Sequence, residues 1–268
     1  MLSIDELNFM KNKNIIVYYI NLSSAIERRE RMERLLSQRG VHASRVEAVV
    51  IRSYDEVIDI YNNSIIDRLY TKTLMLGEIG CYLSHLKCMK NLLESGMEWG
   101  AIMEDDIDLS KNFTHFMHTD WMPNGVKFIK ASSLIDEGRI FYREKKSISL
   151  NNGYSLIKIC KPIPVGTQAY FIHRDAAKYF IEHFSKIEGP IDEVLFSPIF
   201  GFSEKYGNWS IFPFLSRELG GTSNIGKRSP GYGKVYTLRQ FLVRSFYKYR
   251  KSLRKFLCVK EVSKFDMR

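Results

Sequence analysis

The feature that most constrains this chain is an apolar run that ends in a cluster of acids. Residues 101–108 read AIMEDDID, which places four carboxylates within five residues. A short apolar run bounded in this way indicates a buried strand, and ligands of open α/β sheets bind where such strands end. Because clustered carboxylates repel one another, some would take up protons unless a cation neutralised them. The segment therefore favours a site for a hard divalent cation and, through it, phosphate; a solvated acidic turn is the alternative.

Strands and helices alternate along most of the chain. Residues 15–22 form a β-branched and aromatic run, and residues 25–38 favour a helix that is capped by the serines before it and ends at Gly40. A second short strand at residues 44–51 completes a β-α-β unit with a parallel pair. Helices are also predicted at residues 77–93 and 175–186, and strands at residues 99–103, 126–131, 154–160 and 167–173. This order predicts one α/β domain with a mostly parallel central sheet covered on both faces.

Composition limits the class of protein. With 268 residues, of which 45% are hydrophobic, the chain can bury the core of one large domain. Acids near Met1 and the lack of an apolar segment after them argue against a secretory signal, and no run approaches the roughly 20 apolar residues of a membrane-spanning helix. The cysteines show neither a C-x-x-C motif nor a zinc spacing, so we expect reduced thiols and a cytoplasmic protein.

Positive charge is concentrated near the C-terminus. The net charge is +10, and residues 220–260 contain eleven Lys and Arg but no Asp or Glu, which argues against general nucleic-acid binding by the whole molecule. In residues 238–257, apolar side chains recur at threes and fours opposite a cationic face, as in a helix that lies on an anionic membrane surface. We therefore predict a domain of residues 1–226 and a basic amphipathic tail of residues 227–268. Packing of the tail helix on the core, or on the partner in a homodimer, is the alternative.

Three segments together carry the pattern of a known family. Residues 17–22 read VYYINL and are followed by two arginines from Arg28, residues 77–85 read GEIGCYLSH, and residues 101–109 read AIMEDDIDL. In this order and spacing they resemble the I-N-L-x(n)-R, G-E-x-G-C-x-x-S-H and L-E-D-D-x-x-x segments of glycosyltransferase family 25, the lipooligosaccharide biosynthesis galactosyltransferases. Weaker similarity extends the resemblance over about residues 14–226.

The resemblance implies a nucleotide-sugar-binding fold of the glycosyltransferase A type (GT-A). It also implies transfer of galactose from UDP-galactose, with inversion and a β-linkage, onto a lipooligosaccharide or LPS core acceptor, with Mn²⁺ or Mg²⁺ as cofactor. Because that acceptor is linked to lipid, we expect a peripheral enzyme on the inner face of the cytoplasmic membrane, which agrees with the basic tail. The alternatives are another donor, such as UDP-glucose or a UDP-N-acetylhexosamine, and a non-catalytic protein that binds lipid or nucleic acid.

The carboxylates at the end of the acidic strand form the predicted metal site. Transfer from a nucleotide sugar requires a leaving diphosphate, and a divalent metal stabilises the charge that develops on it. Glu104 and Asp106 have the spacing of a D-x-D element, and Asp106 is the expected direct ligand. Asp105 and Asp108 are expected to bind donor hydroxyls or a water on the metal.

The end of the first strand is the predicted site for the nucleotide. Backbone groups of Asn21 and Leu22, together with the Asn21 amide, are expected to hold a uracil ring. Arg28 follows in the first turns of the predicted helix, and its fixed fork suits phosphate or a pairing carboxylate. The alternative is that the charges of residues 28–34 form a solvated helix face with i,i+4 pairs.

The remaining candidates lie at two predicted helix starts. Glu78 begins one helix and, with Asp192, is a candidate catalytic carboxylate; Ser84 and His85, a turn and a half further, are expected near the diphosphate. An inverting transferase needs a general base for the acceptor hydroxyl, and Asp192 occupies a position where the family carries Asp. The alternatives are a packed core histidine at position 85 and an N-cap role of Asp192 for a helix over residues 193–200.

Overall fold

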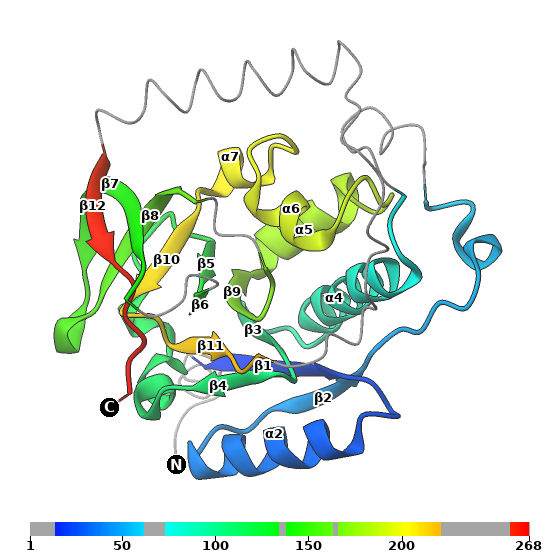
Figure 1. Ribbon diagram of the computed structural model, residues 1–268, viewed down its shortest axis with the longest axis horizontal. Coiled ribbons are helices and arrows are strands. Elements are labelled where there is room, and N and C mark those ends of the chain that lie inside the picture. The colour runs from blue at the N-terminus through cyan, green and yellow to red at the C-terminus, as the bar shows by residue number, and fades with distance from the viewer. Residues whose placement is uncertain (1–13, 62–72, 134–137, 163–165, 221–257, 268) are drawn as a thin grey trace, which may run out of the picture.

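The computed structural model describes residues 14–61, 73–133, 138–162, 166–220 and 258–267. The strands of its main sheet are β1 (Ile15–Asn21), β2 (Ser44–Glu47), β3 (Trp99–Glu104), β5 (Phe128–Lys130), β7 (Ile140–Ser149), β8 (Ser155–Lys161), β9 (Ala169–His173), β10 (Trp209–Phe212) and β12 (Cys258–Val262). Their order is β12-β7-β8-β10-β5-β9-β3-β1-β2 (Figure 1). A smaller sheet has the order β4-β11-β6 and consists of β4 (Ile107–Leu109), β11 (Ser216–Glu218) and β6 (Ser132–Ser133).

The described helices flank this sheet. They are α2 (Ile26–Gln38), α4 (Leu76–Glu94), α5 (Arg174–His183), α6 (Ile191–Phe196) and α7 (Phe202–Tyr206), with short 3₁₀ segments η1 (Tyr54–Val57), η2 (Lys111–Phe116), η3 (Thr119–Trp121) and η4 (Asn151–Gly153). Figure 1 shows α2 on one side of the sheet and α4 and α5 on the other. The predicted α/β class and the cover on both faces are confirmed.

The main sheet is mixed. β1 pairs in parallel with β2 and with β3, as the predicted β-α-β opening requires, and β10 pairs in parallel with β5. β9 runs antiparallel to both β3 and β5, and antiparallel pairing continues from β10 through β8 and β7 to β12. The prediction of a mostly parallel sheet is therefore wrong. Strand direction depends on how distant segments connect, and the local periodicity on which the prediction rested does not record it.

Alternation along β1 builds two cores. Tyr18 and Ile20 face a cluster that includes side chains of α4, α5 and α6, whereas Val17 and Tyr19 face a cluster that includes side chains of α2. Complete burial of one such apolar side chain is worth about 1.5–3 kcal/mol relative to exposure. The ends of β1 and β3 are thus held between two packed layers, and the residues that follow these strands have fixed positions.

The start of α2 differs from the prediction, and its end agrees with it. Ala25 is the N-cap and no side chain caps the helix, so the predicted serine cap is wrong. Gly40 follows the last turn with φ +63°, a conformation that glycine adopts at no steric cost, as the predicted end required. The N–H of Gly40 donates to the carbonyl of Ser37 over 3.0 Å.

Residues 258–267 belong to the main body of the protein. β12 pairs with β7, and Cys258 forms a disulfide with Cys160 of β8 across a sequence separation of 98. The expectation of reduced thiols is wrong for this pair, since strand pairing brings together cysteines whose spacing gave no signal. The predicted tail helix at residues 238–257 lies outside the described residues. Among the helices that are described, none has the length and apolar character needed to cross a membrane.

Candidate active site

A cleft of about 260 Å³ lies where several chain segments converge beside the end of β3. Glu104 comes from the last position of β3, and Asp106 follows it. The first turns of α4 and α6 contribute side chains from one side, and the loop before β9 and the end of β11 contribute others. The polar side chains that line the cleft include Arg28, Glu78, Cys81, Thr167, Gln168, Asp192 and Glu218. The predicted carboxylates at positions 78, 104, 106 and 192 are therefore brought to one cavity.

Glu104 is held as a carboxylate at the floor of this cleft. The Thr167 hydroxyl donates to its Oε1 over 2.5 Å, and His85 Nε2 lies 3.6 Å from the same oxygen. Burial raises the pKa of Glu104, but His85, the Thr167 hydroxyl and the Lys130 ammonium outweigh burial and keep the pKa below its ordinary value. Glu104 thus presents a negative charge to the cleft at neutral pH.

The surroundings of Asp106 suit a ligand of a metal ion. Burial, and then the charge of Glu104, raise the pKa of Asp106 to about 6, and Arg28 only partly offsets them. Its Oδ1 is buried and has no hydrogen-bond partner. Glu218 is a further carboxylate of the cleft lining and raises the pKa of Asp106 further. An unpartnered buried oxygen among crowded carboxylates fits a hard divalent cation, which Glu104 and Asp106 would hold.

Arg28 and Asp105 form the support behind these ligands. Arg28 Nη1 lies 3.2 Å from Asp105 Oδ1 and 3.3 Å from Asp106 Oδ2, so the predicted pairing with carboxylates is present. Asp105 is buried and also accepts a hydrogen bond of 2.6 Å from the Asn21 amide nitrogen. The same nitrogen donates to the Ala25 carbonyl over 3.1 Å. Both amide hydrogens of Asn21 are thus used within the protein, where the sequence had suggested a contact with uracil.

Two further predicted residues lie outside the cleft lining. Leu22 follows β1, and its carbonyl accepts from the N–H of Ala25 over 2.9 Å, which starts the turn into α2. Asp108 lies on β4, where its Oδ2 is 3.2 Å from Arg217 Nη2 of β11 and its Oδ1 accepts from the N–H of Leu109. Asp108 therefore stabilises the small sheet in this structure and does not join the carboxylates of the cleft.

Ser84 connects α4 to the segment after β2. Its hydroxyl is fully buried, accepts from the N–H of Val49 over 2.8 Å and donates to the carbonyl of Gly80 over 2.7 Å. A Cβ on Gly80 would collide with the Val49 carbonyl, so only glycine permits this approach. The glycine and serine of the GEIGCYLSH segment thus position the helix, and Ser84 does not reach the cleft lining.

His85 and Glu78 both belong to α4. His85 is fully buried, and its Nδ1 shares a hydrogen bond of 2.9 Å with the Tyr170 hydroxyl. Its Nε2 is buried without a hydrogen-bond partner. Glu78 lines the cleft, and its Oε2 accepts from the N–H of Met75 over 2.8 Å at the start of the helix. The predicted packed-core role of His85 therefore accounts for Nδ1, which is hydrogen-bonded. It does not account for Nε2, which is not.

Asp192 lies in the first turn of α6. The helix begins at Ile191 with Pro190 as its N-cap, so the predicted N-cap role of Asp192 is wrong. Its Oδ1 accepts from the N–H of Glu193 over 2.9 Å, and its Oδ2 accepts from the N–H of Gly166 over 3.2 Å. Burial raises the pKa of Asp192. An oriented carboxyl with a raised pKa on the wall of a cleft is suited to accept a proton.

Sequence reasoning missed Lys130 and Glu218. Lys130, at the end of β5, is buried and donates to the Gly166 carbonyl, while its Nζ lies 4.3 Å from the centre of the Phe196 ring. Burial lowers the pKa of Lys130 to about 7, against the opposing charges of Asp192 and Glu104. A lone lysine within an apolar strand was the available signal for Lys130. Glu218 had no comparable signal, because it reaches the cleft only through the pairing of β11 with β4.

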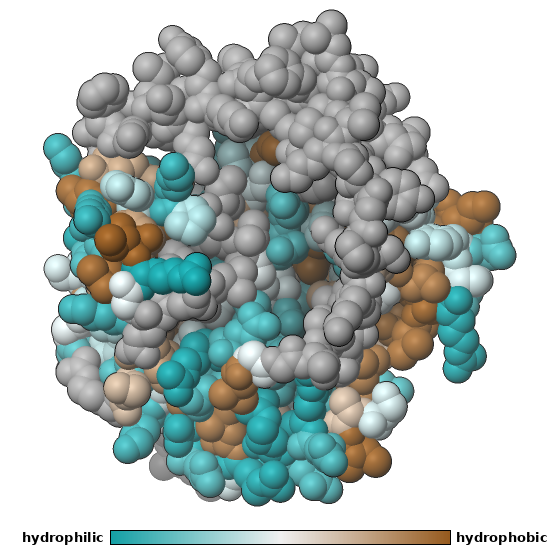
Figure 2. Space-filling view, in the orientation of Figure 1, coloured by the Kyte–Doolittle hydropathy of each residue, from teal (hydrophilic) through white to brown (hydrophobic). Residues whose placement is uncertain are grey.

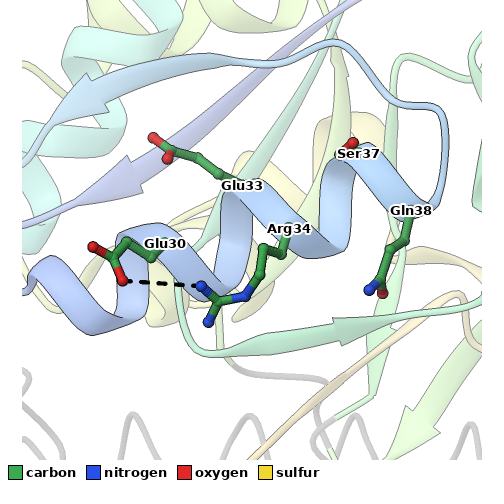
Figure 3. A pocket seen from close by; sticks show the side chains of 5 residues that line it. All are labelled: Glu30, Glu33, Arg34, Ser37 and Gln38. Atoms are coloured by element: carbon green, nitrogen blue, oxygen red, sulfur yellow. Dashed lines mark ion pairs between the residues drawn. The ribbon is translucent and has the colours of Figure 1, made fainter.

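A second depression lies on α2 and shares no residue with the cleft. Figure 3 shows Glu30, Glu33, Arg34, Ser37 and Gln38 along one face of this helix. Arg34 pairs with Glu30 over 3.9 Å at i,i+4 spacing, and most of both side chains is exposed. The surface in this region is largely hydrophilic in Figure 2. For Glu30, Glu33 and Arg34, the predicted solvated helix face is confirmed. It is wrong for Arg31, which is part-buried and donates from Nη1 to the Ile107 carbonyl over 2.9 Å and from Nη2 to the Asp105 carbonyl.

Comparison with known proteins identifies the family. The family model described as Glycosyltransferase family 25 (LPS biosynthesis protein) matches residues 14–195. The chain belongs to glycosyltransferase family 25. The prediction made from the three sequence segments is confirmed.

Individual relatives are identical to this family 25 chain at about a quarter of the aligned positions. It is 26% identical over 176 residues to the lacto-N-neotetraose biosynthesis glycosyltransferase LgtE of Neisseria meningitidis serogroup B, with 63% of this chain and 60% of that protein covered. It is 28% identical over 171 residues to the lipooligosaccharide biosynthesis protein lic2B of Haemophilus influenzae, with 63% of each covered. The matches thus span less than two thirds of these relatives' length.

More distant proteins match shorter or less similar regions. Procollagen galactosyltransferase 1-B of Xenopus laevis is 30% identical over 112 residues, which is 38% of this chain and 18% of that protein. A crystal structure of a glycosyltransferase involved in the glycosylation of the major capsid of PBCV-1 covers 78% of this chain and 94% of its own, with a TM-score of 0.40 and 12% identity.

Proposed function

We propose that this family 25 protein is a metal-dependent hexosyltransferase with a GT-A-like nucleotide-sugar-binding fold. In this proposal it transfers galactose from UDP-galactose, with inversion to a β-linkage, onto a lipooligosaccharide core acceptor. The observation that carries the proposal is the cleft in which Glu104 meets Asp106, whose buried Oδ1 has no hydrogen-bond partner. The names of the relatives support the substrate class, since they include a lacto-N-neotetraose glycosyltransferase, a lipooligosaccharide biosynthesis protein and a procollagen galactosyltransferase.

The donor side of the proposed site uses the crowded carboxylates. Mn²⁺ or Mg²⁺ bound by Glu104 and Asp106 would supply Lewis-acid stabilisation of the leaving diphosphate. Arg28 lies 3.3 Å from Asp106, so its guanidinium adds positive charge next to the place where the diphosphate would bind. Asp105, through its bonds to Arg28 and Asn21, keeps this group in position.

The acceptor side of the proposed site depends on Asp192. In an inverting transfer, the acceptor oxygen forms a bond to the anomeric carbon as the bond to the diphosphate oxygen breaks, and UDP leaves with the electron pair. The acceptor hydroxyl loses its proton to a base, and Asp192 is our candidate. The N–H groups of Gly166 and Glu193 hold its carboxylate in place, which limits its motion during the reaction.

The cellular setting follows from the lipid-linked acceptor. We propose that the enzyme works on the cytoplasmic face of the inner membrane, with residues 227–257 of the basic tail attached to anionic lipid. The alternative role of the tail is a contact between the two subunits of a homodimer. Another hexose donor is the competing substrate, because selection between sugar epimers rests on one or two pocket contacts.

A donor panel tests the proposal. The purified chain with Mn²⁺ is given UDP-galactose, UDP-glucose and UDP-N-acetylhexosamines, together with a lipooligosaccharide core acceptor, and acceptor-dependent release of UDP is measured. UDP-galactose should give the fastest turnover, and Asp192→Asn should lower kcat by about 10²–10⁴-fold. Asp175→Asn is the matched control, because Asp175 is exposed and lies at the opposite end of β9 from the cleft. Equal turnover in the Asp192 variant would rule out the assigned base.

A further inference from the structure

Cys81 and His85 have no part in the proposed transfer, and both lie beside Glu104, which does. Cys81 and His85 lie four residues apart on the same face of α4, and Glu104 faces them from β3. One ligand atom from each of the three lies within 4.8 Å of the others. His85 is fully buried, and its Nε2 has no hydrogen-bond partner although it lies 3.6 Å from Glu104 Oε1.

We propose that Cys81, His85 and Glu104 form a binding site for a divalent ion of the zinc class. A thiolate, an imidazole and a carboxylate are the donor types that zinc takes in proteins, whereas Mg²⁺ and Ca²⁺ prefer oxygen alone. Three protein ligands with an open fourth position are typical of catalytic zinc sites, and here Cys81 and Glu104 also line the cleft. The site rests on these three side chains and holds whether or not the proposed sugar transfer does.

The geometry needs little adjustment. Bond lengths of about 2.0–2.3 Å in a tetrahedral site place two ligand atoms roughly 3.4–3.6 Å apart. The separation of 3.6 Å between His85 Nε2 and Glu104 Oε1 already has this value. Rotation about the Cα–Cβ bond of Cys81 moves only its sulfur, so the third ligand can approach while the helix stays in place.

The neighbours of His85 favour the same interpretation. Histidine ligands of metals usually bond to a second group through the other ring nitrogen, and that bond sets the orientation of the ring. His85 Nδ1 makes such a bond with the Tyr170 hydroxyl over 2.9 Å. The Tyr170 ring also stacks on His85, with ring centres 5.6 Å apart. The imidazole is thus fixed with Nε2 toward Glu104, as a ligand requires.

Cobalt binding tests this site directly. Co²⁺ bound to a thiolate shows a sulfur-to-cobalt charge-transfer band in the near ultraviolet, which a site made of oxygen ligands lacks. We expect this band when Co²⁺ alone is added to the full-length chain with its Cys160–Cys258 disulfide intact. Cys81→Ala should abolish it. Cys88→Ala is the matched control, because Cys88 is a free, buried cysteine on the same helix and lies outside the group of three.

Further variants separate this inference from the proposed function. Asp106→Asn should keep the band even if it abolishes sugar transfer, and Tyr170→Phe should weaken Co²⁺ binding by about tenfold through loss of the bond to His85. Circular dichroism establishes that each variant folds; should Cys81→Ala unfold, loss of the band in a folded His85→Gln variant gives the same test. No band in the wild-type chain, or a band that survives in Cys81→Ala, would overturn the site.

Discussion

Replacement of Asp106 by Asn should make the metal-free protein more stable at neutral pH. The pKa of Asp106 is raised from its ordinary value of 3.8 to about 6. Between these values the unfolded chain ionises while the folded chain keeps its proton, so folding stability falls as the pH rises from about 4 to about 6. At about 1.4 kcal/mol per pH unit, the full penalty above pH 6 is about 3 kcal/mol. An asparagine at this position would carry no charge, so the variant does not have this penalty.

The loss of the Arg28 contact reduces this gain, so we expect Asp106→Asn to be about 1–3 kcal/mol more stable at pH 7. Urea denaturation in EDTA, at about pH 4 and at about pH 7, measures the difference. At about pH 4 the stability difference should be nearly absent, because position 106 is then uncharged in the folded wild type as it is in the variant. A variant that is less stable than wild type at pH 7, or whose advantage is the same at both pH values, would refute the reasoning.

Three further outcomes follow from the structure. Because burial lowers the pKa of Lys130 from 10.5 to about 7, wild-type stability should rise by about 1–3 kcal/mol between pH 7 and pH 9, and urea denaturation of Lys130→Met should show no such rise. Gly80→Ala should lower the free energy of unfolding by about 1–3 kcal/mol, since its Cβ meets the Val49 carbonyl; an unchanged unfolding midpoint would contradict that contact. Because burial raises the pKa of Asp192 above its ordinary value of 3.8 and a base acts in its ionised form, kcat/KM should fall on the acid side with a midpoint above pH 3.8, and the residual activity of Asp192→Asn should lack this limb.

The elements with strong local patterns were predictable. The strands β1 and β3 were predictable from their apolar runs, and α4 from the helical spacing of its apolar residues. The end of α2 was predictable from the glycine that follows it. The antiparallel half of the sheet was not predictable in this way. β9 inserts between β3 and β5, and β12 joins β7 from the far end of the chain, so their directions depend on contacts between distant residues.

The site was predictable to the extent that its residues are neighbours in sequence. Glu104 is the last residue of β3 and Asp106 comes two residues later, so their position at a sheet edge could be predicted without knowledge of distant contacts. Asn21 and Asp105 were predicted to bind the donor, but their side chains form a hydrogen bond with each other. They are far apart in sequence, so only the folded structure shows this contact. Lys130 enters the site through a strand whose apolar pattern predicts burial and gives no reason for a charge there.

Binding of UDP with and without manganese is the most direct test of the central claim that the cleft holds a nucleotide diphosphate through a cation. Isothermal titration calorimetry of UDP into the full-length chain should give saturable binding in Mn²⁺ and none in EDTA. Asp106→Asn should bind no UDP under either condition, whereas Asp175→Asn should bind as the wild type does. UDP binding of equal affinity in EDTA, or undiminished binding by Asp106→Asn, would contradict the account.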